Sequence, residues 1–273
     1  FSILNILLSI VLVTKFDLNI KGVAYGTLFS ALITSIIFLI YMFWYLSKYT
    51  KITINFTQIF NLKKIKNIFN INLNIFIRTI LLTFSFLWFT YLGTQIGEDY
   101  VAANAILINL VFLSAFILDA YAFSTEGIVG YSLGKKDLNL FKNIVKNSFI
   151  LSSISGLIIS IIFFFTNNLV INLMSDIEEI RTLSSSYVVW LIILPVISSF
   201  CYQFDGIFIG ASQTKELRNA MIFSVFSYLL ISILLIKFLF NTGIWISLCI
   251  FMILRAISLF YYLDKIYLRF RKN

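Results

Sequence analysis

Histidine is absent from the sequence, proline occurs once, and cysteine occurs twice. Without histidine, the usual zinc sites and every histidine-based catalytic triad are excluded. Cys201 and Cys249 both lie inside apolar runs, so we interpret them as packing residues rather than as a disulfide or a metal pair. A phosphate-binding loop is also missing, because the nearest segment, GYSLGKK at 130–136, lacks the spacing and the Ser or Thr after lysine. We therefore predict that the protein is not an enzyme and has no cofactor.

Charge is scarce as well, at 12% of the 273 residues, whereas 60% are hydrophobic and 18% aromatic. Soluble domains carry about 25% charged residues, so this is the composition of a membrane protein. Each apolar run is predicted to be a transmembrane helix. The eight runs are roughly 1–14, 22–46, 70–96, 101–130, 148–170, 185–210, 218–240 and 242–264. The predicted fold class is an all-α, polytopic helical bundle.

The first run, 1–14, is too short to cross a bilayer, and the chain opens on Phe1 rather than methionine. It also lacks the basic segment that begins a signal peptide. We expect further helices upstream of Phe1 in the native protein.

Basic residues are distributed unequally between the two ends of the predicted helices. The loops after the second, fourth and sixth runs, together with the C-terminal tail, hold fifteen of the 21 Lys and Arg residues, and the opposite side holds four. This bias predicts a cytoplasmic C-terminus in a plasma (bacterial inner) membrane. The net charge of +9 then serves topology and lipid headgroups, so we expect membrane lipids as partners and no nucleic acid.

The longest connection, 47–69, predicts a boundary between two helical bundles. Its apolar residues from 59 to 69 fall on one helical face, which is typical of an amphipathic helix at the cytoplasmic surface. The predicted division is 1–46 for two helices of an N-terminal bundle, 47–69 for the linker, 70–264 for a six-helix bundle and 265–273 for a basic tail.

Two acids, Asp119 and Glu126, lie seven residues apart in the run 101–130 and therefore point to the same side of one helix. The rest of that side consists of small residues, namely Ala115, Ala122 and Gly130. An acid at the bilayer centre costs roughly 2.5–3.5 kcal/mol, which makes such residues functional candidates. The simpler alternative is that both acids only neutralise arginines on neighbouring helices.

A second group of candidates lies in the run 185–210. Pro195 is predicted to bend or loosen this helix, because it removes one backbone hydrogen bond. Asp205 follows ten residues later, and Gly206 and Gly210 have the spacing that permits close helix contact. We favour plain packing for the two glycines and a functional role for Asp205.

Two arginines, Arg78 and Arg255, are also predicted inside the membrane as charge partners. Counted from the nearest cytoplasmic lysines at 1.5 Å per residue, they share a layer with Glu126 and Asp205, and Asp119 lies about 10 Å deeper. Two positive charges thus face three negative ones. We expect Arg78 to pair with an acid of 101–130 and Arg255 with another acid, which leaves Asp205 as the exchangeable site. Alternatively, Asp205 pairs with Arg255 and Glu126 titrates.

Short motifs, in order along nearly the whole chain, carry a family resemblance. They are Leu4-Asn5-Ile6, GVAYGT at 22–27, RTILL at 78–82, AANAIL at 102–107, LDAYAFSTEGIVG at 118–130, Leu133-Gly134, WLIILP at 190–195, FDGIFIGA at 204–211, RNAM at 218–221 and LRAIS at 254–258. Together they resemble the multidrug and toxic-compound extrusion (MATE) transporters, and within that family the DinF-like branch. The resemblance implies helices five to twelve of a monomeric twelve-helix antiporter with two six-helix bundles. Such antiporters expel amphiphilic, often cationic small molecules in exchange for protons or sodium.

The sequence departs from the family pattern at positions that bear on ion coupling. Ser9 stands where many relatives have an aspartate on the fifth helix, and the first-helix aspartate of this branch would lie upstream of Phe1. Arg78 stands on the helix where other branches place a sodium-binding glutamate, whereas Asp205 matches the aspartate of sodium-coupled relatives. The resemblance therefore favours proton coupling and leaves sodium at Asp205 open.

Two other functions compete with export of small amphiphiles. A flippase for a lipid-linked saccharide would need a cavity rich in arginine and lysine, and only Arg78 and Arg255 are predicted there. A structural membrane protein without transport would leave three buried carboxylates without a purpose.

Overall fold

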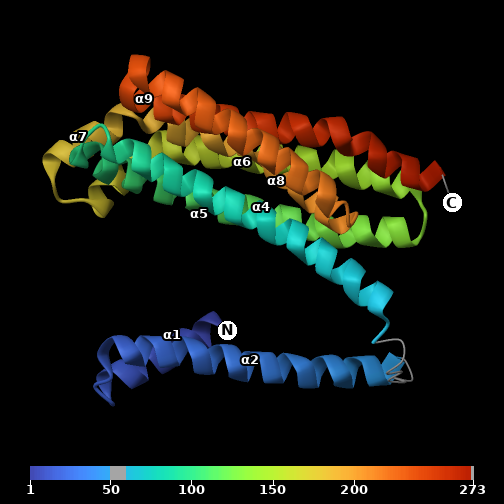
Figure 1. Cartoon of the computed structure of the whole chain (residues 1–273). Helices are drawn as coiled ribbons and strands as arrows, with labels where there is room; N and C mark the ends of the chain where they lie inside the picture. Colours follow the sequence, from blue (N-terminus) through green and yellow to red (C-terminus); the bar gives the residue numbers. More distant parts are fainter. Residues whose placement is uncertain (50–59, 272–273) are drawn as a thin grey trace. The chain divides into compact units, whose positions relative to one another are not determined.

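The computed structural model describes residues 1–49 and 60–271 of the chain (Figure 1). Over these residues all regular secondary structure is helical. The helices are α1 (Ser2–Thr14), α2 (Asn19–Tyr49), α4 (Leu62–Thr94), α5 (Glu98–Gly134), α6 (Leu138–Met174), α7 (Glu178–Ser186), α8 (Val188–Gly210) and α9 (Thr214–Arg271). The predicted all-α fold class is confirmed.

Six of the described helices are long and apolar enough to cross a membrane, namely α2, α4, α5, α6, α8 and α9. With 13 residues, α1 is shorter than a span. The 58-residue α9 is broken at Phe240, whose backbone has φ 48° and ψ −130°, so it consists of two helical segments. This break falls between the predicted runs 218–240 and 242–264. The predicted run 185–210 differs from the structure at its start. Its first two residues belong to α7, which ends at Ser186, and α8 begins at Val188.

The chain divides into two compact units, residues 1–65 and 66–273. The division falls inside the predicted linker 47–69. Residues 50–59 of that linker lie outside the described residues, and residues 62–69 form the first turns of α4.

In the first unit, α1 and α2 form a close antiparallel pair. A Cβ atom added to Gly26 of α2 would lie 2.9 Å from the backbone of Ser9 on α1, so the pair requires glycine at that point. The Ser9 hydroxyl donates a hydrogen bond to Asn5 Oδ1 at 3.2 Å. Ser9 is thus a packing position in this pair.

In the second unit, α5 and α8 approach most closely where small residues face each other. A Cβ atom on Gly206 of α8 would collide with the carbonyl oxygen of Ala122, and one on Gly210 would collide with that of Glu126. Both glycines therefore face α5, and the two helices run in the same direction with Gly206 level with Ala122. This register positions the charged residues of the unit relative to one another.

A buried amide pair joins α5 to α9 just after the break at Phe240. Asn104 and Asn241 exchange two hydrogen bonds, of 2.6 and 3.0 Å, and the Trp245 indole N–H donates to Asn104 Oδ1 at 2.9 Å. All three side chains are buried. Because buried polar groups are costly when unpaired, this network fixes the second segment of α9 against α5.

Candidate functional site

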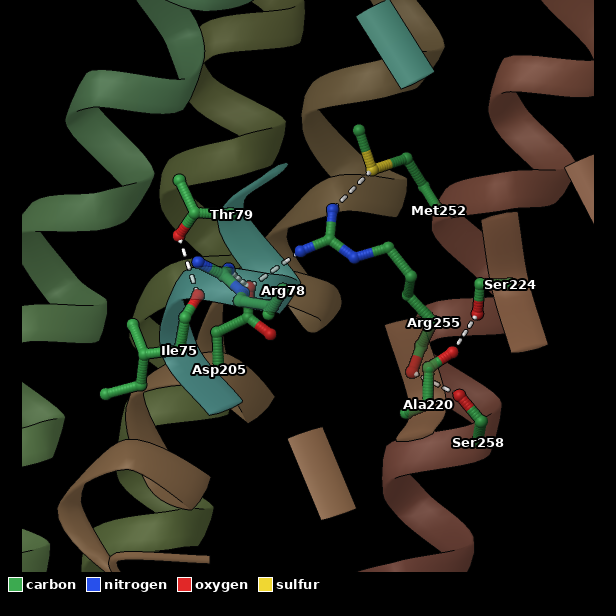
Figure 2. A network of polar contacts seen from close by, with 9 residues as sticks. All are labelled: Ile75, Arg78, Thr79, Asp205, Ala220, Ser224, Met252, Arg255 and Ser258. Atoms are coloured by element: carbon green, nitrogen blue, oxygen red, sulfur yellow. Dashed lines mark hydrogen bonds and ion pairs between the residues drawn. The ribbon is translucent and has the colours of Figure 1, made fainter. Parts of the chain in front are cut away.

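Three charged residues from three different helices meet at one carboxylate oxygen. Arg255 Nη2 of α9 lies 2.7 Å from Asp205 Oδ2 of α8, and Arg78 Nη2 of α4 binds the same oxygen (Figure 2). The side chain of Arg255 is 1% exposed, that of Asp205 6% and that of Arg78 15%. We call these three residues the charge cluster. It is buried between the helices, and Arg78 is its most exposed member.

Arg255 is held by two further contacts besides Asp205. Its Nη1 lies 3.4 Å from Met252 Sδ, and its guanidinium carbon lies 5.4 Å from the centre of the Phe251 ring. A cation over an aromatic face is stabilised by the ring quadrupole, more strongly so when water is excluded. Arg255 is therefore a positive charge whose position is fixed by neighbouring residues of α9.

The cluster contains two positive charges and one negative charge, so its formal charge is +1. Several of its polar atoms also have no hydrogen-bond partner, namely Asp205 Oδ1, Arg78 Nε and Arg255 Nε. Buried charges are normally compensated fully, because taking an ion out of water costs several kcal/mol. The imbalance calls for another negative group close by.

Asp119 of α5 supplies that group. Gly206 is level with Ala122, so Asp205 is level with residue 121 and Asp119 is displaced along the axis by about 3 Å. The half-buried carboxylate of Asp119 interacts electrostatically with Asp205, Arg78 and Arg255. Within the part of the chain that the structure describes, it forms no ion pair. The four residues together are formally neutral when Asp119 is ionised.

The favoured pairing predicted from the sequence is wrong, because Arg78 binds Asp205 rather than an acid of α5, and Asp205 is not unpaired. The Asp205–Arg255 pair of the alternative prediction is present. The predicted depths are also corrected. Glu126 is level with Gly210, about 7 Å from Asp205 along the axis, so Asp119 lies nearer than Glu126. Lysines in loops of different length lie at different distances from the membrane, so residue counts from these lysines do not give comparable depths.

Glu126 is half-buried and belongs to no ion pair among residues 1–49 and 60–271. Its backbone forms part of the contact with Gly210. The structure brings Arg78, Asp205, Arg255 and Asp119 together and leaves Glu126 outside this group.

Pro195 lies inside α8, which continues as a helix on both sides of it. The neighbouring α6 packs tightly there, because a Cβ atom on Gly156 would lie 2.9 Å from the Pro195 carbonyl oxygen. Ser160 of α6 donates a hydrogen bond to the Ile192 carbonyl oxygen at 2.6 Å, and Ser152 donates one to the Ser199 carbonyl oxygen at 3.4 Å. We did not predict this contact. The signal was present, since Ser152, Gly156 and Ser160 form a stripe of small residues at intervals of four.

A bundle of long apolar helices with charged residues buried between them defines an integral membrane protein of the polytopic helical class. The MatE family model matches residues 75–237, which is more than half of the chain, so the protein belongs to the MatE family. The resemblance to MATE transporters drawn from the sequence is confirmed.

Individual relatives agree with this assignment. The chain is 30% identical over 258 residues to "DNA damage-inducible protein F" of Escherichia coli (strain K12), which covers 94% of this chain and 56% of the relative. It is 24% identical over 260 residues to "Protein DETOXIFICATION 43" of Arabidopsis thaliana, covering 94% of this chain and 47% of the relative. The chain thus spans about half the length of these relatives.

The fold matches solved structures over its whole length. The outward-facing conformation of a multidrug resistance MATE family transporter of the MOP superfamily aligns with a TM-score of 0.86 at 18% identity, covering 100% of this chain and 61% of the other. A MOP superfamily transporter from Pyrococcus furiosus aligns with a TM-score of 0.85 at 17% identity, covering 98% and 61%. At these identities the similarity concerns the fold.

Proposed function

We propose that this chain belongs to a secondary active antiporter that exports amphiphilic, cationic small molecules in exchange for protons. It works by alternating access in the plasma (bacterial inner) membrane, with the C-terminus in the cytoplasm. The observation that carries the proposal is a half-buried carboxylate, Asp119, beside a charge cluster with a formal charge of +1. Membership of the MatE family and the name of a further relative, "Multidrug export protein MepA" of Staphylococcus saprophyticus, support export as the direction of transport.

The proton site in this proposal is Asp119, and Asp205 stays ionised. Protonation of Asp205 would leave two guanidinium groups buried without a counter-ion, which costs several kcal/mol. Protonation of Asp119 leaves the charge cluster intact and changes the net charge of the site by one unit. A cationic substrate and a proton can then compete for the same carboxylate, which is what an antiporter needs.

Protons are preferred over sodium for an electrostatic reason. A sodium ion at Asp205 would share the carboxylate with Arg78 and Arg255, and like charges about 4 Å apart repel by about 4 kcal/mol at an effective dielectric constant of 20. Both guanidinium groups bind Asp205 Oδ2, so a cation at Oδ1 of the same carboxylate would still lie close to two like charges.

The experiment compares Asp119→Asn with Glu126→Gln in the native protein at matched membrane levels. Proton release on addition of a cationic dye, and dye efflux driven by a proton gradient, should both be lost in Asp119→Asn. They should persist in Glu126→Gln, the matched control on the same helix. Normal coupling in Asp119→Asn would refute the assignment of the proton site, and efflux driven by a sodium gradient alone would refute proton coupling.

A flippase for a lipid-linked saccharide is the competing function. Its pyrophosphate would need basic side chains in the bundle. Arg78 and Arg255, the arginines predicted to lie inside the bundle, both already bind Asp205, which argues against this function.

A further inference from the structure

The helices α6, α8 and α9 belong to the second unit (Figure 1). Side chains from all three line an apolar groove. Its volume is about 420 Å³. The principal lining residues are Phe149 of α6, Phe200 and Phe204 of α8, and Ala256, Phe260 and Leu263 of α9. The rings of Phe149 and Phe204 meet edge to face at 4.8 Å, and those of Phe204 and Phe260 at 6.3 Å. The groove is therefore walled by aromatic rings that already pack on one another.

The groove lies near those ends of the helices that carry lysines. Its lining begins at Val145, seven residues after the start of α6, and extends to Leu263, eight residues before the end of α9. At 1.5 Å per residue these positions are about 10–12 Å from the helix ends. Because α6 is about 55 Å long and the hydrocarbon core only about 30 Å thick, the helix projects beyond the hydrocarbon. The lysine-bearing end of the groove therefore lies close to the lipid headgroups. Lys142 and Lys146 are exposed and precede Val145 and Phe149 by three residues, so they flank the groove on the same helix face.

We propose that this groove binds one acyl chain of an anionic phospholipid, whose headgroup is held by Lys142 and Lys146. The lining offers only hydrocarbon side chains, which suit an acyl chain and leave a headgroup without hydrogen-bond partners inside the groove. The lysines supply the complementary charge at its mouth, since each basic side chain near the membrane surface attracts anionic lipid.

The size of the groove argues against a protein helix as occupant. A helix about 10 Å wide rises 5.4 Å per turn, so about 420 Å³ accommodates roughly one turn. A packed helix would need a longer groove, whereas a flexible acyl chain can enter from the surrounding bilayer and lie along the three helices.

The experiment measures tryptophan quenching by brominated lipids in the native protein reconstituted into nanodiscs. Phe260→Trp places a reporter in the groove, and Phe223→Trp places one on an exposed face of α9 that does not line it. Each signal is taken as the difference from the unsubstituted protein. Brominated phosphatidylglycerol should quench the groove reporter with about tenfold higher apparent affinity than brominated phosphatidylcholine, corresponding to about 1 kcal/mol per lysine with part lost to screening. The reporter at position 223 should show no such preference.

The preference should disappear when Lys142→Gln and Lys146→Gln are combined. It should persist in the matched control that combines Lys135→Gln and Lys136→Gln, which removes two lysines from the adjoining loop. Equal quenching of both reporters by both lipids would overturn the proposal. Absence of quenching at position 260 would do so too, because it would mean that protein covers the groove. Ile257→Trp, at another lining position, provides the same readout if Phe260→Trp does not fold.

Discussion

Asp205 pairs with two buried guanidinium groups through one oxygen atom, so we expect its carboxylate to contribute more to the stability of the second unit than a usual ion-pair partner. Replacing it with asparagine removes the charge but keeps the shape of the side chain. Breaking a buried ion pair from one side costs about 3–5 kcal/mol, because the remaining charge stays buried and unpaired. We therefore expect Asp205→Asn to lower the thermal unfolding midpoint of the detergent-solubilised protein strongly.

The origin of this loss is tested with a double variant. Combining Asp205→Asn with Arg255→Met also removes the more deeply buried of the two cations, and should recover part of the stability. Glu126→Gln, which alters an acid outside the charge cluster, should leave the unfolding midpoint nearly unchanged. An Asp205→Asn protein as stable as the unsubstituted one would contradict the importance of the cluster.

Which charged residues lie in the helical bundle could be predicted from the sequence, but their pairing could not. Arg78, Asp205 and Arg255 stand out because charges are rare in apolar runs. Their partners depend on how far each helix is rotated and shifted along its axis. That register is determined by contacts such as Gly206 against Ala122, which the sequence pattern allows without specifying the partner helix.

At the scale of the helices, the contact between α5 and α8 depends on the absence of a side chain at Gly206. Even alanine would bring a methyl group against the carbonyl oxygen of Ala122, which cannot move without shifting the helix. Overpacking of this kind costs about 1–3 kcal/mol. We expect Gly206→Ala to lower the unfolding midpoint and the yield of folded protein in the membrane.

Gly127→Ala is the matched control for this prediction. Gly127 lies inside α5, and a Cβ atom there would meet nothing within 4 Å. Alanine is favoured over glycine in a helix by up to about 1 kcal/mol, so this variant should be as stable as the unsubstituted protein or more so. Equal loss of stability in both variants would show that the close contact with α5 is not the cause.

The backbone is strained at the break in α9, because Phe240 adopts a positive φ, which residues other than glycine rarely do. Its side chain is 66% exposed, so little packing would be lost on its removal. We expect Phe240→Gly to stabilise the protein by about 1 kcal/mol, the lower end of what such strained residues cost. Phe238→Gly is the matched comparison, because Phe238 is 78% exposed but helical, and it should destabilise by about 1 kcal/mol. A higher unfolding midpoint in Phe238→Gly than in Phe240→Gly would contradict the assignment of strain.

The helices themselves were largely predictable, because apolar runs and the sparse charges between them mark spans and loops. The contact of α6 with the Pro195 region was missed. Ser152, Gly156 and Ser160 look like ordinary small residues until the neighbour that they approach is known. The hydroxyl groups of Ser152 and Ser160 donate to carbonyl oxygens of α8, and such side chain to backbone bonds between helices leave no pattern in the partner sequence.

For the whole molecule, the unequal distribution of lysine and arginine predicts its orientation in the membrane. A cysteine introduced at Lys136 or Lys215 should resist an impermeant thiol reagent added outside intact cells, whereas one at Glu178 should react. The natural cysteines, Cys201 and Cys249, are buried and should contribute little background. Labelling at position 136 from outside would reverse the proposed orientation.

The meeting of α4, α8 and α9 at a single carboxylate oxygen has a mechanical consequence. An arginine that binds both oxygens of a carboxylate is fixed in direction as well as distance, because the two bonds must stay parallel. Here each guanidinium group contacts Oδ2 alone, so the distance is constrained and the direction is free. The ion pairs themselves therefore set no direction for α4 or α9 relative to α8. For α9 the direction is set by other contacts, such as the Asn104–Asn241 pair with α5. Separation of α4 or α9 from α8 would leave buried ions unpaired.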